Sequence, residues 1–95
     1  MVDKQHGVFG ISVAADMASM EIQNLRVYER RGLLTPERTP GGTRLYSEQD
    51  VDRLVRIGEL LGAGLNLAGI RKVLELEHAV DTLRSENDRL RARKR

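Results

Sequence analysis

The spacing of hydrophobic and polar positions divides the chain into four helical segments, with a short extended region after the second. Ser12 can cap a first helix that ends near Met20. A second helix is expected from about Glu21 to Arg31, because Gly32 stands where a residue with positive φ commonly ends a helix. Two short helices joined this closely predict a helix-turn-helix.

The extended region has the pattern of a small hairpin. Thr39-Pro40-Gly41-Gly42 fits a type II turn, in which proline fixes φ at the second position and Gly41 takes a positive φ at the third. Leu34-Thr35 is then expected to pair with Arg44-Leu45-Tyr46 as a wing beside the helices.

Two longer helices are expected after the hairpin. Ser47 and Asp50 form a capping-box pattern, and the helix they open carries apolar residues at Val51, Leu54, Val55, Ile57 and Leu61. Gly62 and Gly64 end that helix. Asn66 can cap the next one, which is expected to continue to the C-terminus because neither proline nor glycine follows Gly69.

The last helix carries a heptad-like apolar seam. Residues spaced alternately by three and four are typical of a short coiled coil, which predicts a dimer through Val73, Leu76, Val80, Leu83, Asn87 and Leu90. A polar residue at Asn87 typically specifies register and lowers stability, whereas the pattern leaves a parallel or an antiparallel arrangement open. The expected fold is mainly α, a winged helix-turn-helix with a hairpin wing. Its parts are an N-terminal arm (1–10), a winged-helix domain (11–72) and a dimerisation helix with a basic tail (73–95).

Composition limits the function classes. A chain of 95 residues forms one small domain, and the absence of cysteine excludes disulfides, thiolate metal sites and zinc fingers. No apolar run approaches the ~20 residues that span a bilayer, so a soluble cytosolic protein without a membrane partner is expected. His6 and His78 are far apart in sequence and have no other ligand types near them, so no metal site is expected. No cofactor and no enzymatic activity are expected either.

The net charge of +2 is unevenly distributed. Five arginines and two glutamates lie between residues 23 and 46, and a second basic zone covers residues 84–95. Clustered arginines beside a helix-turn-helix indicate a protein that binds the phosphates of a duplex. The candidate DNA-binding residues are Gln23, Asn24, Arg26, Tyr28, Arg30, Arg31, Arg38, Thr43, Arg44 and Tyr46.

These candidates differ in the role expected of them. Gln23 and Asn24 lie on the first turn of the second helix, where amide side chains can pair with adenine. Arg26 can contact a base or a phosphate, and Arg44 on the wing is expected to contact a phosphate. The two tyrosines could present a hydroxyl to phosphate or be purely structural rings. The remaining arginines could equally be solvated charge.

The combined pattern resembles the MerR family of winged-helix regulators. The resemblance rests on Leu25-Arg26-x-Tyr28-Glu29-x-x-Gly32-Leu33-Leu34, then on Arg38, Gly42, Arg44 and Tyr46, and on Ser47 with Asp50-Val51. Within the family, Ile11 to Ala15, Arg38-Thr39-x-Gly41-Gly42 and Asn66 to Ile70 are most similar to the heat-shock repressor (HspR) branch. The chain departs from the common pattern at Val27, often aromatic in the family, and at Glu21, often Ser or Thr.

The resemblance implies a bacterial, nucleoid-associated homodimer that is joined by an antiparallel pair of long C-terminal helices and binds an inverted repeat in promoter DNA. For the heat-shock branch it also implies repression of chaperone-type genes with a DnaK-type chaperone as co-repressor. Two alternatives remain at this stage. One is an excisionase-like or architectural protein assembled on direct repeats, and the other is a protein-interaction module whose basic face is incidental.

Overall fold

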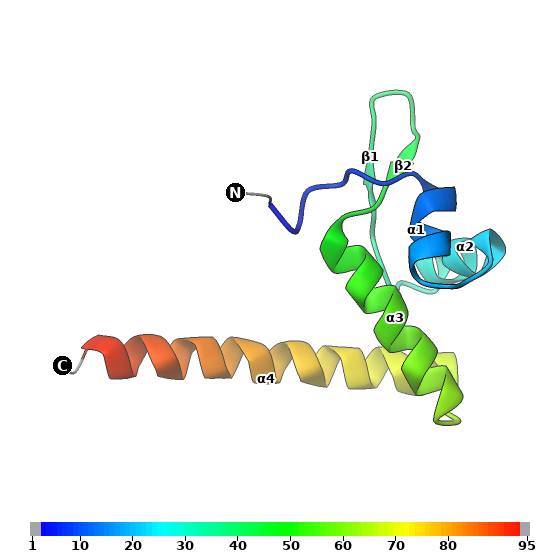
Figure 1. Ribbon diagram of the computed structural model, residues 1–95. Helices are drawn as coiled ribbons and strands as arrows, with labels where there is room; N and C mark the ends of the chain where they lie inside the picture. Colours follow the sequence, from blue (N-terminus) through cyan, green and yellow to red (C-terminus); the bar gives the residue numbers. More distant parts are fainter. Residues whose placement is uncertain (1–2, 94–95) are drawn as a thin grey trace.

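The computed structural model describes residues 3–93 and shows a small helical body from which one long helix extends (Figure 1). The expected mainly helical, winged fold is confirmed. In chain order the elements are α1 (Ile11–Met17), α2 (Ile22–Arg30), β1 (Glu37–Arg38), β2 (Arg44–Leu45), α3 (Glu48–Gly62) and α4 (Leu67–Arg93).

The first two helices form the predicted helix-turn-helix. α2 ends as expected: Gly32 has φ 76°, and the Gly32 and Leu33 amides donate to the Glu29 and Tyr28 carbonyls at 3.0 and 2.9 Å. These two bonds satisfy carbonyls that the helix end would otherwise leave unpaired. The predicted start of α1 is wrong, because Gly10 is its N-cap and Ser12 makes no capping bond. α1 also ends at Met17, and Ser19 supplies the positive φ of 55°.

The wing has a different register from the one predicted. Glu37 pairs with Leu45 and Arg38 with Arg44, whereas Leu34 is buried in the core and belongs to no strand. Burial of that leucine stabilises the body more than a ladder position on an exposed hairpin would. The prediction of a type II turn with a positive φ at Gly41 is also wrong. The positive φ lies at Gly42 (88°), as in a type I turn followed by one left-handed residue.

Residues 7–9 pack beside the wing. Phe9 forms an antiparallel bridge with Tyr46, whose amide donates to the Phe9 carbonyl at 2.7 Å. Gly7 lies against the wing so closely that a Cβ there would be 2.6 Å from the Leu45 carbonyl oxygen. The Gly7 amide also donates to Glu37 Oε1 at 2.6 Å. A third extended segment therefore supports the base of the hairpin.

α3 begins at the predicted capping box. The Asp50 amide donates to Ser47 Oγ at 3.0 Å, and the Ser47 amide donates to Asp50 Oδ2 at 2.9 Å. Its buried side follows a spacing of three residues, so Leu60 is buried while Val55 and Leu61, predicted as apolar-face positions, are 44% and 38% exposed. The core of the body consists of the side chains of Ala14, Ala15, Leu25, Tyr28, Leu33, Leu34, Tyr46, Val51, Leu54, Ile57, Leu60, Ile70 and Leu74.

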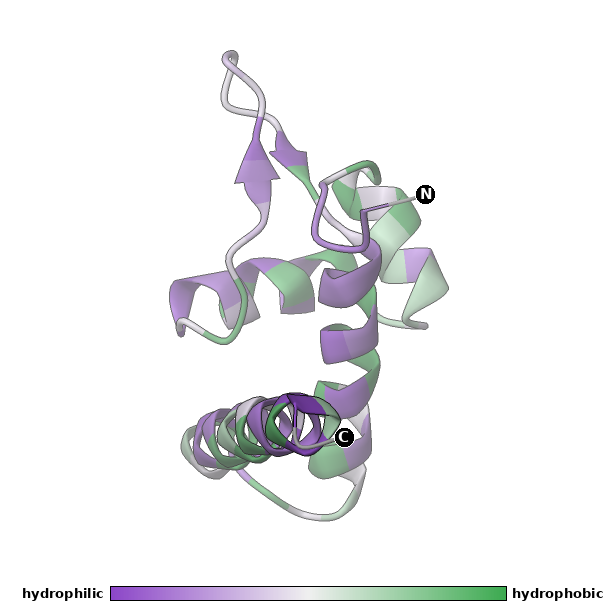
Figure 2. Ribbon diagram, turned by 90° about the vertical axis from the view of Figure 1, so that its left-hand side faces the viewer, coloured by the Kyte–Doolittle hydropathy of each residue, from purple (hydrophilic) through white to green (hydrophobic). Residues whose placement is uncertain are grey.

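α4 is one uninterrupted helix. Asn66 caps it as predicted, since the Gly69 amide donates to Asn66 Oδ1 at 2.8 Å. Its first turns pack on the body, where Arg56 of α3 binds Glu77 at 2.7 Å, and the rest extends beyond the body (Figures 1 and 2). The division expected between residues 72 and 73 falls within this helix. Among residues 3–93, no helix combines the length and apolar character that crossing a bilayer requires.

Candidate nucleic-acid interface

One face of α2 is open to solvent and carries the residues predicted to contact bases. Leu25 and Tyr28 anchor the helix in the core, at 0% and 5% exposure. The side chains of Gln23, Asn24 and Arg26 are exposed on the first turns. A helix held this way from behind presents amide and guanidinium groups outward, which is the chemistry needed to contact base edges and phosphates.

The wing is tied to α2 through a single carboxylate. Glu29 accepts a hydrogen bond from Arg44 Nε at 2.5 Å and another from Arg38 Nη2 at 2.8 Å. Its side chain is 19% exposed, whereas those of Arg38 and Arg44 are 46% and 30% exposed. Partial burial alone would raise the pKa of Glu29, but the hydrogen bonds and charges of the two arginines outweigh it and lower the pKa. Glu29 therefore remains ionised and holds both wing arginines near the helix.

Arg38 and Thr39 hold the tip of the wing. Arg38 Nη1 donates to the Gly42 carbonyl at 3.0 Å, and the Thr43 amide donates to Thr39 Oγ1 at 3.1 Å. Thr43 is itself exposed at this tip. The wing thus presents an exposed threonine and two partly exposed arginines on a braced turn.

The two tyrosines differ in what their hydroxyl groups could contact. Tyr46 is fully buried, its hydroxyl has no hydrogen-bond partner among the described residues, and burial raises its pKa. Of the two roles considered for Tyr46, the burial of its ring and hydroxyl favours the structural one. Tyr28 is also a core residue, and burial raises its pKa. Its side chain lines an open surface hollow together with Asn24.

Arg30 and Arg31 lie at the far end of α2, away from its first turn. Both are exposed, and Arg31 borders a small hollow beside Arg71 at the start of α4. Their distance along the helix from Gln23 and Asn24 makes them candidates for flanking phosphates and not for the same base pairs.

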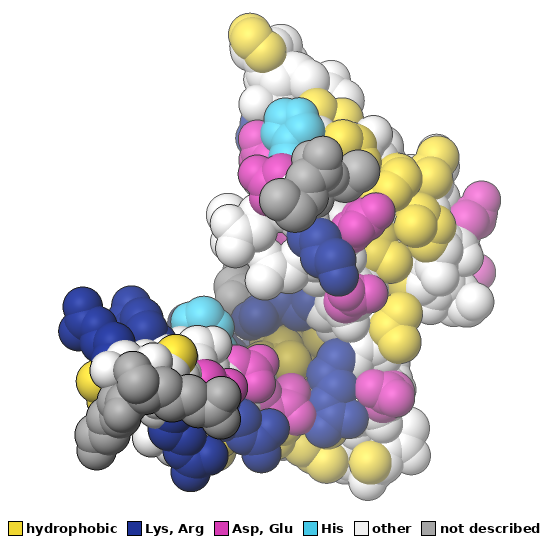
Figure 3. All heavy atoms as spheres, turned by 60° about the vertical axis from the view of Figure 1, so that its left-hand side comes forward, with side chains coloured by type: hydrophobic (Ala, Val, Ile, Leu, Met, Phe, Trp, Pro, Cys, Tyr) yellow, Lys and Arg dark blue, Asp and Glu magenta, His cyan; other side chains and the backbone are white. Residues whose placement is uncertain are grey.

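The projecting part of α4 carries the predicted apolar seam. Leu76, Val80, Leu83 and Leu90 are between 44% and 64% exposed, and Asn87 lies on the same side as Val80 and Leu83. Val73, predicted as the first seam residue, is instead partly buried against the core of its own chain. Positively charged side chains gather around the far end of this helix in Figure 3, where the described basic residues are all arginines.

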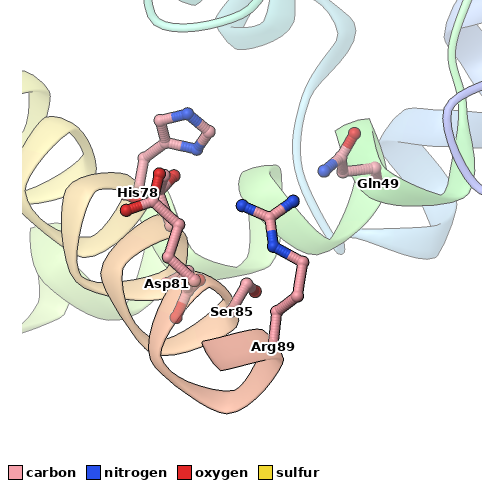
Figure 4. Close-up of a pocket in the computed structure, with 7 residues that line it drawn as sticks. Gln49, His78, Asp81, Ser85 and Arg89 are labelled. Atoms are coloured by element: carbon pink, nitrogen blue, oxygen red, sulfur yellow. The ribbon is translucent and has the colours of Figure 1, made fainter. Parts of the chain in front are cut away.

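A polar hollow of about 590 Å³ lies between the first turn of α3 and the side of α4 (Figure 4). His78 and Arg89 project into it from α4, and Gln49 borders it from α3. Within residues 3–93, no group of three or more His, Asp or Glu side chains is arranged to hold a metal ion.

The contact of Glu29 with the wing arginines was not predicted from sequence. Its partners lie 9 and 15 residues away and leave no local pattern. The support of the wing by Gly7 was missed for the same reason, since its contact with Leu45 joins distant parts of the chain.

The fold and the exposed basic helix define a winged helix-turn-helix DNA-binding protein. The family model described as "MerR HTH family regulatory protein" matches residues 9–77, which is most of the chain. The chain therefore belongs to the MerR family of transcription regulators.

Known relatives agree with this assignment. The chain is 42% identical over 86 residues to a protein of Streptomyces coelicolor named "Putative heat shock protein HspR", covering 90% of this chain and 57% of that one. It is 43% identical over 67 residues to the "HTH-type transcriptional regulator GlnR" of Bacillus anthracis, covering 70% and 52%. The chain thus spans little more than half the length of these curated relatives.

Solved structures show the same fold. The crystal structure of the transcription regulator PbrR691 from Ralstonia metallidurans, determined in complex with lead(II), superposes with a TM-score of 0.69 at 28% identity. The match covers 93% of this chain and 81% of that one.

Proposed function

We propose that this protein is a sequence-specific repressor that binds an inverted repeat in promoter DNA as a homodimer. The observation that carries the proposal is the solvent-facing first turn of α2, with Gln23, Asn24 and Arg26 beside a braced basic wing. In helix-turn-helix proteins the corresponding helix lies in the major groove, and half-sites are centred a multiple of ~34 Å apart.

Dimerisation would place two such helices on one duplex. The exposed leucines and valine of α4 form a stripe that water solvates poorly, and a second copy of the same stripe is a suitable cover. A seam of this length pairs weakly alone, so contacts between the bodies or binding to DNA would add to it.

The genes under control are proposed to be of the heat-shock or chaperone type, with a DnaK-type chaperone as co-repressor in the bacterial cytoplasm. The support is the 42% identity to the HspR protein over 90% of the chain. Similar identity to GlnR covers a shorter stretch, 70% of the chain.

Selection of bound duplexes from a random pool tests the DNA-binding part. An inverted repeat is expected to be enriched, whereas direct repeats would favour the architectural alternative and no enrichment would contradict the proposal. Arg26→Ala and Arg44→Ala should each weaken binding and reduce the slope of log affinity against log salt by about one. Lys72→Ala, which removes an exposed positive charge from α4, is the matched control.

A separate experiment tests the co-repressor. Addition of a purified DnaK-type chaperone should strengthen operator binding in a gel-shift assay and produce a slower complex. An unchanged shift would remove the chaperone from the proposal but leave the DNA-binding part intact.

A further inference from the structure

The pair of wing arginines held by one carboxylate suggests a role that charge counting alone does not reveal. Glu29 lies on α2, the helix proposed to read bases, and Arg38 and Arg44 lie on the wing proposed to contact phosphates. Two positive charges and one negative charge are thus in direct contact between the two DNA-facing elements.

We propose that Glu29 is a positioning residue that increases discrimination between operator and random-sequence DNA. This inference rests on the proposed contact of the wing with phosphate. Through Glu29 the wing arginines are held in one geometry relative to α2, and their attraction for any nearby phosphate is reduced.

The geometry supports the first part of this role. The two arginines use different atoms of the carboxylate, Arg44 on Oε1 and Arg38 on Oε2, so both oxygens are occupied. Arg38 continues the connection to the Gly42 carbonyl at the wing tip. A rigid link therefore runs from α2 to the turn, and the positions of α2 and the wing are coupled.

The charge balance supports the second part. Non-specific binding depends on how many positive groups replace counterions on the phosphates, with a slope of about 0.9 per phosphate neutralised. A carboxylate in contact with both guanidinium groups competes with phosphate for their hydrogen bonds. On random-sequence DNA, where α2 makes no favourable base contacts, this competition should keep the affinity low.

Glu29→Gln is the direct test, because it keeps the shape and removes the charge. Binding to random-sequence duplex should tighten about two- to tenfold near 0.1 M salt, with a steeper salt slope. Operator affinity should rise less or fall, because the wing is no longer fixed, so the ratio of operator to random affinity should decrease.

Glu21→Gln is the matched control. Glu21 is exposed at the N-cap of the same helix and makes no side-chain capping bond. An equal effect of both variants would show a general charge effect and overturn the inference. A parallel loss of operator and random binding in Glu29→Gln, together with a lower melting temperature, would show that Glu29 only stabilises the fold and would also overturn it.

Arginine side-chain NMR of the wild-type protein gives a test that needs no substitution. The Nε–H group of Arg44 should give a slowly exchanging, shifted signal in the free protein and in the operator complex. A rapidly exchanging, averaged signal in the free protein would contradict the inference. If instead Arg38→Ala and Arg44→Ala leave all DNA binding unchanged, the proposed wing contact itself fails, which is a separate result.

Discussion

At the scale of single residues, Tyr46 shows how burial decides between two roles. Its ring has 0% exposure and its hydroxyl is buried without a partner in the described part of the chain. Burying a hydroxyl without a hydrogen bond costs stability, so its removal should not be harmful. Tyr46→Phe is expected to leave DNA affinity unchanged and to keep or raise the free energy of unfolding, by up to about 1 kcal/mol. Urea denaturation measures the free energy of unfolding, and a binding titration measures DNA affinity. Weaker DNA binding by a fully folded variant would support a contact between the Tyr46 hydroxyl and phosphate.

Glu29 should give the protein a specific sensitivity to acid. Although partial burial acts against it, contact with Arg44 and Arg38 lowers the pKa of Glu29 below its ordinary 4.5. The folded chain therefore holds this proton less tightly than the unfolded chain, so the stabilisation is present above pH 4.5 and is lost as pH falls through the folded pKa. The difference in unfolding free energy between wild type and Glu29→Gln should be largest near neutral pH and shrink in acid. A difference independent of pH would exclude this linkage.

At the scale of elements, the wing depends on the N-terminal segment that lies beside it. A Cβ at residue 7 would meet the Leu45 carbonyl oxygen at 2.6 Å, whereas one at residue 10 would meet nothing within 4 Å. Gly7→Ala should therefore displace the segment and destabilise the protein by about 1–3 kcal/mol. Gly10→Ala should have a much smaller effect. Thermal unfolding compares the two, and hydrogen exchange at the Tyr46 amide reports whether the bridge to Phe9 opens; equal stabilities would contradict the tight fit.

Helix ends were predictable from sequence where the signal is local. The capping box at Ser47, the cap at Asn66 and the helix end at Gly32 each need only neighbouring residues, and all three are confirmed. The predicted start of α1 and the predicted register of the wing were wrong, because contacts between distant parts of the chain determine both. Leu34 enters the core instead of a strand, and Phe9 pairs with Tyr46 across 37 positions.

The candidate interface was predictable to a similar extent. The exposed face of α2 follows from the spacing of its buried residues, Leu25 and Tyr28. The bonds of Arg38 and Arg44 to Glu29 do not follow from local spacing, because they form only when the wing packs against α2. Sequence therefore indicates which side chains could contact DNA, and tertiary structure determines how they are held.

At the scale of the whole molecule, α4 extends the chain well beyond its body (Figure 1). Isolated helices are marginal in water, so the projecting turns of a 27-residue helix need a partner for most of their stability. The apolar stripe supplies a surface for such a partner, and the opposite side of the helix lines the polar hollow of Figure 4.

Leu83→Glu therefore tests the proposed dimer. Leu83 is 64% exposed in the single chain, so a charge there should leave the body folded but repel a second copy at the seam. Ser85→Glu introduces the same charge on the side that lines the polar hollow and is the control. Sedimentation equilibrium should show a dimer for wild type and the control and a monomer for Leu83→Glu.

Operator affinity should also fall in Leu83→Glu, because separate chains lose the high effective concentration that linked half-site binding provides. A wild-type monomer that still binds DNA would instead favour assembly on direct repeats, since recognition of an inverted repeat by this fold depends on the two-fold symmetry of the dimer.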